Sequence, residues 1–165
     1  MKAIVAVCKD WAIGKDGKLL IANKQDMKHF VELTRNTTVI MGRKTLESFP
    51  GKKPLKNRRN IVITREANYA PEGCTIVHSV KEALAAIDPD EPAWLIGGDS
   101  IYRQMIEYCD ECYVTYHNTQ VPADTYFPNL DENNDWTCVE TSEAHKTKDS
   151  IEFEYRIYKN LALKS

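Results

Sequence analysis

The stretch VIMGRKT at residues 39–45 decides the fold of this chain, and WLIGGDS at residues 94–100 repeats its pattern. In both, a short apolar run leads into glycine and then into polar residues that favour a helix. Continuous apolar runs of this length are typical of strands that are buried on both faces. The glycines indicate tight strand-to-helix turns. The two stretches therefore predict an α/β protein with a largely parallel sheet.

The alternation of strands and helices continues on either side of these stretches. Apolar runs predict strands at residues 4–7, 38–41, 60–64, 74–77, 93–96 and 112–117. Helical spacing predicts helices at residues 25–35, 44–49, 79–87 and 100–108. The first helix is expected to turn one stripe inward, formed by Met27, Phe30, Val31 and Thr34. Ser79 is the expected cap of the third helix, with Glu82 completing a capping box.

The C-terminal part of the chain follows a different pattern, because no helix is predicted after residue 117. Residues 136–141 and 151–158 alternate apolar and polar side chains and predict an antiparallel hairpin. Residues 14–17 are expected to form a loop. No repeat or linker divides the chain. We therefore expect one domain over residues 1–165, with a mostly parallel mixed sheet between flanking helices and an antiparallel hairpin at its C-terminal end.

Composition argues against several classes of function. The chain has 165 residues, 42% hydrophobic and 28% charged, and a formal net charge of −2, as in an ordinary globular domain. This charge does not indicate a nucleic-acid or membrane-surface partner. The N-terminal apolar run is too short for a signal peptide, and no apolar stretch reaches the ~18–20 residues of a membrane span. We therefore expect a cytoplasmic protein.

The five cysteines are expected to be reduced thiols, because their number is odd and no export signal precedes them. Cys109 and Cys112 have the spacing of a zinc half-site or a redox pair. A structural zinc site needs four ligands, and no second pair of this kind follows. A redox pair opens a helix, whereas this one runs into a strand. No metal site is expected.

Both glycine turns are candidate anion sites, because ligands of open α/β sheets bind where strands end and helices begin. Arg43 and Lys44 would oppose the helix dipole unless an anion lies there. The alternative is a solvated basic turn. At Gly97-Gly98 the missing Cβ atoms would let a ligand approach the backbone, although a simple tight turn is the alternative. The chain has neither a GxGxxG nor a GxxxxGK[ST] pattern.

Two further pairs carry guanidinium groups at the ends of predicted strands. Thr64-Arg65 follows the strand at 60–64 and suits a phosphate such as the 2′-phosphate of NADP, unless Arg65 is simply solvated. Arg58-Arg59 precedes that strand, and one of the two can bind a carboxylate with both nitrogens. A solvated pair is the alternative.

Asp26 is the candidate acid or base. It lies near the start of the first helix, where a carboxylate commonly complements the helix dipole. It also shares a face with Phe30, four residues on, and Met27 lies between them. A carboxylate in an apolar pocket has a raised pKa and becomes an acid/base candidate. Spacing leaves both interpretations open.

With these residues in place, the whole chain resembles the dihydrofolate reductases. The order and spacing of the matching residues carry the resemblance: Ile4-Val5-Ala6, Ile13-Gly14, Asp26-Met27 with Phe30, Ile40 through Thr45, Leu55 through Arg58-Arg59-Asn60, Ile96-Gly97-Gly98, Ile101-Tyr102 and Asp124 through Pro128. The resemblance implies the family's eight-stranded sheet. It also implies NADPH-dependent reduction of 7,8-dihydrofolate to 5,6,7,8-tetrahydrofolate, with hydride transfer to C6 and protonation at N5.

The resemblance also implies roles for individual residues. Asp26 holds the pterin and promotes protonation at N5, Thr115 bonds to Asp26, and Arg58 grips the glutamate carboxylate. The other implied substrate-binding residues are Ile4, Val5, Ala6, Met27, Phe30, Phe49, Leu55 and Ile96. The implied NADPH-binding residues are Ala6, Ile13, Gly14, Lys15, Asp16, Gly17, Lys18, Leu19, Gly42, Arg43, Lys44, Thr45, Ile63, Thr64, Arg65, His78, Gly97, Gly98, Asp99, Ser100, Ile101, Tyr102 and Gln104. The family's Gly97-Gly98 peptide is cis.

One segment departs from the family pattern. Residues 14–19 resemble the mobile loop that closes over nicotinamide. Many members follow it with Leu-Pro-Trp and place a proline just before the aspartate, where this chain has Leu19-Leu20-Ile21 and Lys24. The missing indole removes a donor that would help to fix water near Asp26, which bears on proton delivery and antifolate sensitivity.

Two alternative functions stay open at this point. One is a same-fold reductase acting on a pyrimidine intermediate of the riboflavin pathway, against which the Asp26–Phe30 pair and Arg58 argue. The other is a non-catalytic folate- or nucleotide-binding homologue. For the main interpretation we expect dihydrofolate and antifolates as small-molecule partners, no nucleic-acid or membrane partner, and a monomer.

Overall fold

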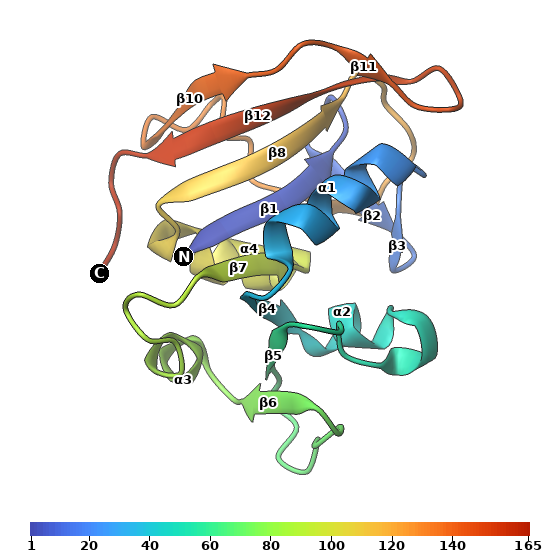
Figure 1. Ribbon diagram of the computed structural model, residues 1–165. Coiled ribbons are helices and arrows are strands. Elements are labelled where there is room, and N and C mark those ends of the chain that lie inside the picture. Colours follow the sequence, from blue (N-terminus) through green and yellow to red (C-terminus); the bar gives the residue numbers. More distant parts are fainter.

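A twisted sheet runs through the molecule, with its strands in the order β10-β12-β8-β1-β7-β4-β5-β6 (Figure 1). The computed structural model describes residues 1–165. The strands are β1 (Lys2–Val7), β4 (Thr38–Gly42), β5 (Arg59–Ile63), β6 (Cys74–Val77), β7 (Ala93–Gly97), β8 (Glu111–His117), β10 (Trp136–Thr141) and β12 (Glu152–Asn160). Strands β8, β1, β7, β4, β5 and β6 pair in parallel, whereas β12 and β10 are antiparallel. The expected mixed sheet and C-terminal hairpin are confirmed, with one addition: the short strand β11 (His145–Lys146) pairs with β12.

Helices cover both faces of this sheet and make three layers. They are α1 (Lys24–Thr34), α2 (Arg43–Glu47), α3 (Val80–Ala85) and α4 (Asp99–Met105), with short 3-10 turns at Pro50–Lys52 and Ile106–Tyr108. Side chains from α3 and α4 pack with Val5 and Ile40 in one buried cluster. Side chains from α1 and α2 pack with Ile4 and Val39 in another. Because successive residues of a strand point to opposite faces, β1 and β4 supply both clusters.

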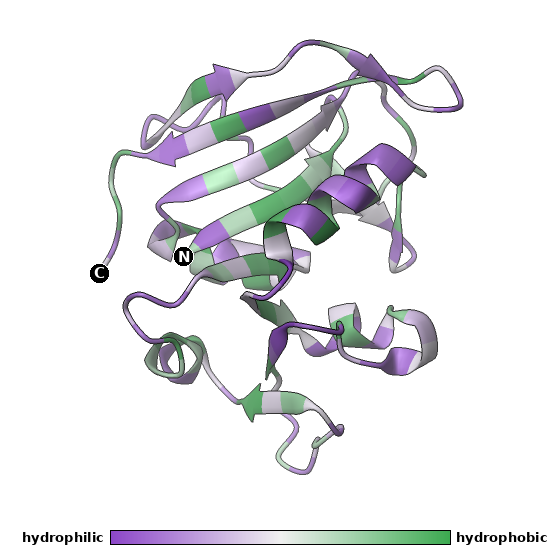
Figure 2. Ribbon diagram, in the orientation of Figure 1, coloured by the Kyte–Doolittle hydropathy of each residue, from purple (hydrophilic) through white to green (hydrophobic).

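The hydrophobic core follows the central strands. Figure 2 shows β1 largely in green, whereas α1, lying in front of it, is mainly purple on its outer turns. Residues 38–41 of β4 are all buried, as are Ala93, Trp94 and Leu95 of β7. This agrees with the continuous apolar runs from which these strands were predicted.

Residues 12–19 correct one expectation, because they form a hairpin rather than a loop. Strands β2 (Ala12–Lys15) and β3 (Lys18–Leu19) join β9 (Thr125–Tyr126) in a second, three-stranded sheet. The two residues between β2 and β3 have positive φ values, 52° at Asp16 and 75° at Gly17. An Asp-Gly pair with both φ values positive is a favoured connection for a tight hairpin. The backbone N–H of Asp16 also donates to Asp124 Oδ2 at 2.9 Å.

The inward stripe predicted for the first helix is wrong at two positions. Met27 is 52% exposed and Val31 is 40% exposed, whereas Thr34 is buried and Phe30 partly buried. Phe30 and Leu33 are the α1 side chains that pack against the apolar cluster on the sheet. The prediction assumed that the sheet packs against the whole length of the helix. Met27 borders a pocket instead.

The predicted capping box is correct in one half. Ser79 caps α3, and its side chain accepts from the N–H of Glu82 at 3.0 Å. The Glu82 carboxylate, however, accepts from the N–H of His78 at 2.6 Å, one residue before the expected donor. The helices also end earlier than predicted: α3 at Ala85, α2 at Glu47, and α4 at Met105, where a 3-10 turn follows.

Candidate active site

Asp26 lies in the first turn of α1, and the cap of that helix fixes its backbone. Asn23 is the cap residue, and its Oδ1 accepts from the N–H of Asp26 at 3.1 Å. On β8, the buried Thr115 donates from Oγ1 to Asp26 Oδ1 at 2.6 Å. The hydrogen bond that the family resemblance implied is therefore present. The other carboxylate oxygen has no hydrogen-bond partner in the protein.

The surroundings of Asp26 favour its neutral form. Burial raises the pKa of the Asp26 carboxyl above its ordinary value, and this effect outweighs the Thr115 hydrogen bond and the histidines His117 and His29, which act in the opposite direction. A buried carboxylate loses hydration, which disfavours its charged form. The protonated form of Asp26 is therefore populated up to a higher pH than it would be in water. Asp26 can therefore carry a proton closer to neutral pH.

Asp26 faces a pocket of about 230 Å³. Ten of its thirteen lining residues are hydrophobic, and the other three are Asn23, Asp26 and His117. The hydrophobic residues are Ala6, Val7, Cys8, Ala12, Ile13, Leu19, Leu20, Ile21, Ala22 and Met27. The sequence predicted Ala6, Ile13, Leu19, Asp26 and Met27 at a site, and the structure brings them together here.

Sequence reasoning missed Asn23 and His117. Signals for both were present: Asn23 stands three residues before Asp26 as a helix cap, and His117 follows Thr115 by two residues on one strand. A period of two places both β8 side chains on the same face.

The proposed pterin-binding side chains gather in one apolar cluster. Ile4 is a buried member of this cluster, and the partly buried side chains that pack against it include Phe30, Phe49, Leu55 and Ile96. Val5 differs from the other members of the predicted substrate set. Its side chain packs in the cluster on the opposite face of the sheet.

The glycine turns lie along one edge of the sheet, because β7, β4, β5 and β6 are neighbours and parallel. A Cβ placed on Gly98 would lie 3.6 Å from Thr45 Oγ1, and one on Gly42 would lie 3.0 Å from Ile101 Cγ1. At the next strand end, His78 Nδ1 lies 2.8 Å from the carbonyl oxygen of Thr64. The predicted cofactor turns, which are distant in sequence, therefore form a continuous row. The Gly97-Gly98 peptide in this row is cis.

The cations along this edge differ in how they are paired. Arg43 forms ion pairs with Glu47 at 3.1 Å and with Glu66 at 3.6 Å. Arg65 is exposed and forms no ion pair. Lys44 is likewise exposed and unpaired. An anion at this edge would therefore find no carboxylate competing for Arg65 but would compete with two carboxylates for Arg43.

Two residues of the predicted cofactor set belong to the core. Ile101 is 9% exposed, and Tyr102 is 4% exposed with its hydroxyl donating to the Ile4 carbonyl oxygen at 2.6 Å. Their side chains therefore hold α4 against the sheet. Ile63 also packs against the core. In the first turns of α4, Gln104 Nε2 donates to the carbonyl and hydroxyl oxygens of Ser100, next to Asp99.

The hairpin β2–β3 carries the remaining predicted cofactor residues. The partly buried Ile13 and the 69% exposed Leu19 both line the Asp26 pocket. Lys15, Asp16, Gly17 and Lys18 at its tip are exposed. Gly14 is buried, and a Cβ there would lie 2.7 Å from Thr125 Oγ1. The hairpin thus forms one wall of the pocket and extends into solvent.

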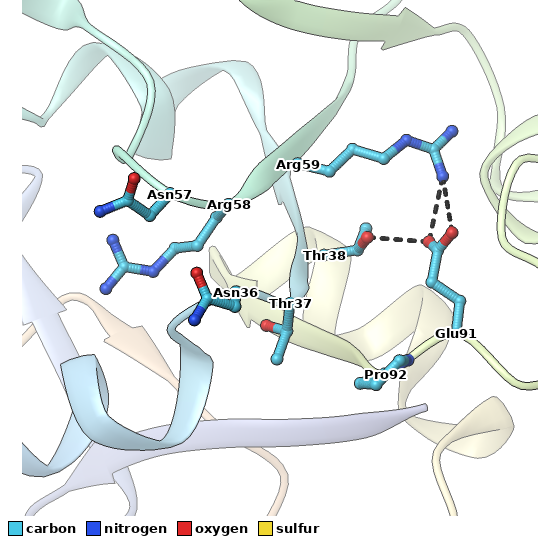
Figure 3. Close-up of a pocket in the computed structure, with 8 residues that line it drawn as sticks. All are labelled: Asn36, Thr37, Thr38, Asn57, Arg58, Arg59, Glu91 and Pro92. Atoms are coloured by element: carbon cyan, nitrogen blue, oxygen red, sulfur yellow. Dashed lines mark hydrogen bonds and ion pairs between the residues drawn. The ribbon is translucent and has the colours of Figure 1, made fainter.

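A second, larger hollow of about 410 Å³ lies at the opposite edge of the sheet, where β4 and β5 begin (Figure 3). None of its lining residues is hydrophobic. Arg59 in this hollow is paired with Glu91 at 3.0 Å. Figure 3 shows the Arg58 guanidinium pointing away from that pair, and its Nε donates to Thr34 Oγ1 at 3.0 Å. Of the two arginines, Arg58 is therefore the one without a carboxylate partner.

Two remaining features concern metals and membranes. The structure contains no group of three or more His, Cys, Asp or Glu side chains that could hold a metal ion. Cys109 and Cys112 are buried free thiols, and burial raises the pKa of Cys109 to about 12, so its thiolate is scarce at neutral pH. None of the helices has the length and apolar character needed to cross a membrane.

Comparison with known proteins gives one consistent result. The family model described as dihydrofolate reductase matches residues 1–160. A dihydrofolate reductase of Bacillus subtilis is 35% identical over 94% of this chain and 91% of its own length. One from Staphylococcus haemolyticus is 32% identical over 96% and 94%. A solved dihydrofolate reductase from Enterococcus faecalis, complexed with NADP(H) and RAB-propyl, has a TM-score of 0.86 at 34% identity and covers 96% of this chain and 95% of its own.

Proposed function

This chain belongs to the dihydrofolate reductase family, and we propose that it carries out the NADPH-dependent reduction of 7,8-dihydrofolate to 5,6,7,8-tetrahydrofolate at the Asp26 pocket. The observation that carries this assignment is the Asp26 carboxyl, bonded to Thr115 at 2.6 Å in a pocket whose other walls are mostly apolar. A reaction that consumes a proton at a heterocycle needs such a group beside its ring-binding surface.

Asp26 is the group that we assign to proton delivery and pterin binding. Asp26 lines the pocket, and the Thr115 bond keeps one of its two carboxylate oxygens in place. The apolar cluster of Ile4, Phe30, Phe49, Leu55 and Ile96 suits the flat rings of the substrate. Arg58, which has no carboxylate partner of its own, suits the glutamate carboxylate.

The row of strand ends fits NADPH. Apart from Thr45 Oγ1 at 3.6 Å, a Cβ on Gly98 would meet no atom within 4 Å, so the backbone there is open to a ligand. When bound, NADPH supplies the hydride that reaches C6 of the pterin. Gly42 through Thr45 and Gly97-Gly98 would hold its phosphates at two helix N-termini. Thr64, Arg65, Arg43 and His78 would surround the adenosine 2′-phosphate.

The function is tested by following NADPH absorbance with purified protein. We expect loss of absorbance that depends on added dihydrofolate. Absence of any substrate-dependent loss would overturn the assignment. A methotrexate-binding titration separates it from the riboflavin-pathway alternative, which the family match does not favour, because that substrate lacks the pterin and glutamate that methotrexate imitates.

We expect NADPH to be preferred over NADH, and Arg65→Gln to reduce that preference by about tenfold, the worth of one charge-assisted hydrogen bond. Arg65 is the unpaired guanidinium at the Thr64 turn, so its loss weakens NADPH binding without changing NADH binding. The matched variant Glu66→Gln removes a carboxylate 3.6 Å from Arg43 and should tighten NADPH binding. Fluorescence titration with both cofactors measures the two ratios. Equal affinity of the wild-type protein for NADPH and NADH would discard the 2′-phosphate assignment.

The remaining expectations concern the whole protein. We propose a single domain over residues 1–165 that acts as a monomer in the cytoplasm, supplies tetrahydrofolate for one-carbon metabolism and binds antifolates. The continuous sheet and the net charge of −2 support one domain without a nucleic-acid partner. Sedimentation of the purified protein tests the monomer.

A further inference from the structure

The polar side chains of the Asp26 pocket include two that the proposed reaction does not use. Asn23 and His117 are the other polar lining residues, and they are 7% and 1% exposed. Polar groups in such a place lower stability unless they are fully hydrogen-bonded. Asn23 and His117 satisfy this condition by bonding to each other, with 3.1 Å between Asn23 Nδ2 and His117 Nε2.

Their partners fix which atoms carry hydrogen. His117 Nδ1 lies 3.1 Å from the carbonyl oxygen of Val7, which can only accept, so Nδ1 carries the proton. Burial lowers the pKa of His117, so the ring is neutral at neutral pH and its Nε2 is an acceptor. Asn23 therefore donates from Nδ2 to Nε2. Its Oδ1 is left to accept from the N–H of Asp26 at 3.1 Å.

The result is a directed chain of hydrogen bonds from β1 to the first turn of α1. It runs from Asp26 through Asn23 and His117 to Val7. Strand β8 thus holds Asp26 in two ways, because Thr115 and His117 are on the same face of that strand. Thr115 binds the carboxylate directly, and His117 holds the backbone of the same residue through the helix cap.

We infer that Asn23 and His117 are positioning residues for proton delivery, which keep the first turn of α1 at the depth where Asp26 reaches both Thr115 and the pterin. The inference rests on the proposed function. It gives a role to Asn23 and His117, which line the same pocket as Ile21, the residue that stands where many family members have a tryptophan. Because proton transfer depends steeply on distance, a small displacement of this turn is enough to slow the reaction.

The first test is His117→Leu, which removes the anchor but leaves the Asn23 cap. We expect kcat to fall by about tenfold or more while KM for dihydrofolate changes by less than about threefold, since the ring-binding cluster is untouched. Displacement of Asp26 weakens its bond to Thr115, which stabilises the ionised form, and the variant also removes the His117 interaction that lowers the Asp26 pKa. Both changes should raise the pKa of Asp26. The groups that face Asp26 are then His29 from α1 and Tyr155 from β12. A kcat and pH profile equal to those of the wild type would overturn the inference.

A double-mutant cycle separates positioning from a purely structural role. Asn23→Leu leaves the buried His117 Nε2 without a partner and also removes the helix cap, whereas the double variant Asn23→Leu/His117→Leu leaves neither polar partner behind. We expect the double variant to be no less stable in urea than Asn23→Leu, yet to keep the reduced kcat. Recovery of kcat together with stability would show that the pair acts through stability, and would overturn the inference.

His145→Leu is the matched control. His145 belongs to the same aromatic group, stacked on Phe153 with ring centroids 5.4 Å apart, and Phe153 also contacts His117. It has no hydrogen bond to Asn23 or Val7, so its kcat should equal that of the wild type. The pKa of Asp26, measured by ¹³C NMR of the carboxyl group, is a readout that does not need turnover. If the wild-type protein fails to oxidise NADPH, the proposed function fails, and an unchanged Asp26 pKa in His117→Leu separately overturns the inference.

Discussion

Replacing Asp26 with asparagine is expected to lower turnover at pH 7 by about 10²- to 10⁴-fold, the usual contribution of a positioned general acid. The amide has nearly the shape of the carboxyl and can still accept from Thr115 Oγ1, but it cannot hold and release a proton. NADPH binding should be unchanged, because the row of strand ends that we assign to the cofactor does not include Asp26. Stopped-flow measurement of hydride transfer and a fluorescence titration measure the two effects.

The pH dependence gives this variant its sharpest readout. The reaction consumes a proton at N5, so the wild-type rate should fall as pH rises through the Asp26 pKa, which burial has raised. In Asp26→Asn that transition should vanish, and the remaining rate should increase towards acid pH as solvent supplies the proton. An unchanged pH–rate profile would remove Asp26 from the chemistry. Glu32→Gln, which removes an exposed carboxylate from the same helix, is the control and should leave the profile as it is.

Stability should change in the opposite direction to activity in Asp26→Asn. A carboxyl whose pKa is raised on folding binds more protons in the native than in the unfolded state, so its contribution to stability is lost as pH rises above its unfolded pKa. At pH 7 the asparagine variant is therefore expected to resist urea at least as well as the wild type. Such a result would identify the low activity as a chemical defect, and it fits the general exchange of stability for function at active sites.

The sequence predicted the central strands because each is buried on both faces and is therefore apolar without interruption. The hairpin at residues 12–19 escaped this criterion, since its strands are short and it is specified by a turn, Asp16-Gly17, rather than by a periodic pattern. The exposure of the Met27 side chain could not be predicted from the helical spacing either. A helix stripe shows which side chains share a face, but not whether a sheet or a pocket lies opposite that face.

The site residues also divide into those that a local sequence pattern predicts and those that depend on the tertiary arrangement. Residue types at strand ends predicted the glycine turns, but their alignment depends on β7 lying between β1 and β4, which chain order does not reveal. Asn23 and His117 each have an ordinary structural explanation when considered singly, as a helix cap and as a buried strand residue. The positioning role that we infer depends on the hydrogen bond between them, which joins residues 94 positions apart and so leaves no local signal in the sequence.

Gly97→Ala and Gly98→Ala are expected to separate the folding role of this turn from its role in binding. Gly97 has a φ of 119°, which side chains rarely adopt, and a Cβ there would lie 3.1 Å from Cε2 of Tyr102. Tyr102 is buried and bonded to β1 through Ile4, so it cannot move aside cheaply. We expect Gly97→Ala to lower the free energy of unfolding by about 3 kcal/mol, from backbone strain and overpacking together.

Gly98→Ala meets neither obstacle, because its φ is −82° and its Cβ would make an ordinary contact of 3.6 Å with Thr45 Oγ1. Its stability in urea should stay within about 1 kcal/mol of the wild type. The added methyl group nevertheless stands on the backbone that we assign to the cofactor, so NADPH affinity should fall by at least about tenfold. If Gly98→Ala binds NADPH as the wild type does, the cofactor does not approach this turn. If Gly97→Ala is fully stable, Tyr102 is not the rigid neighbour that requires glycine there.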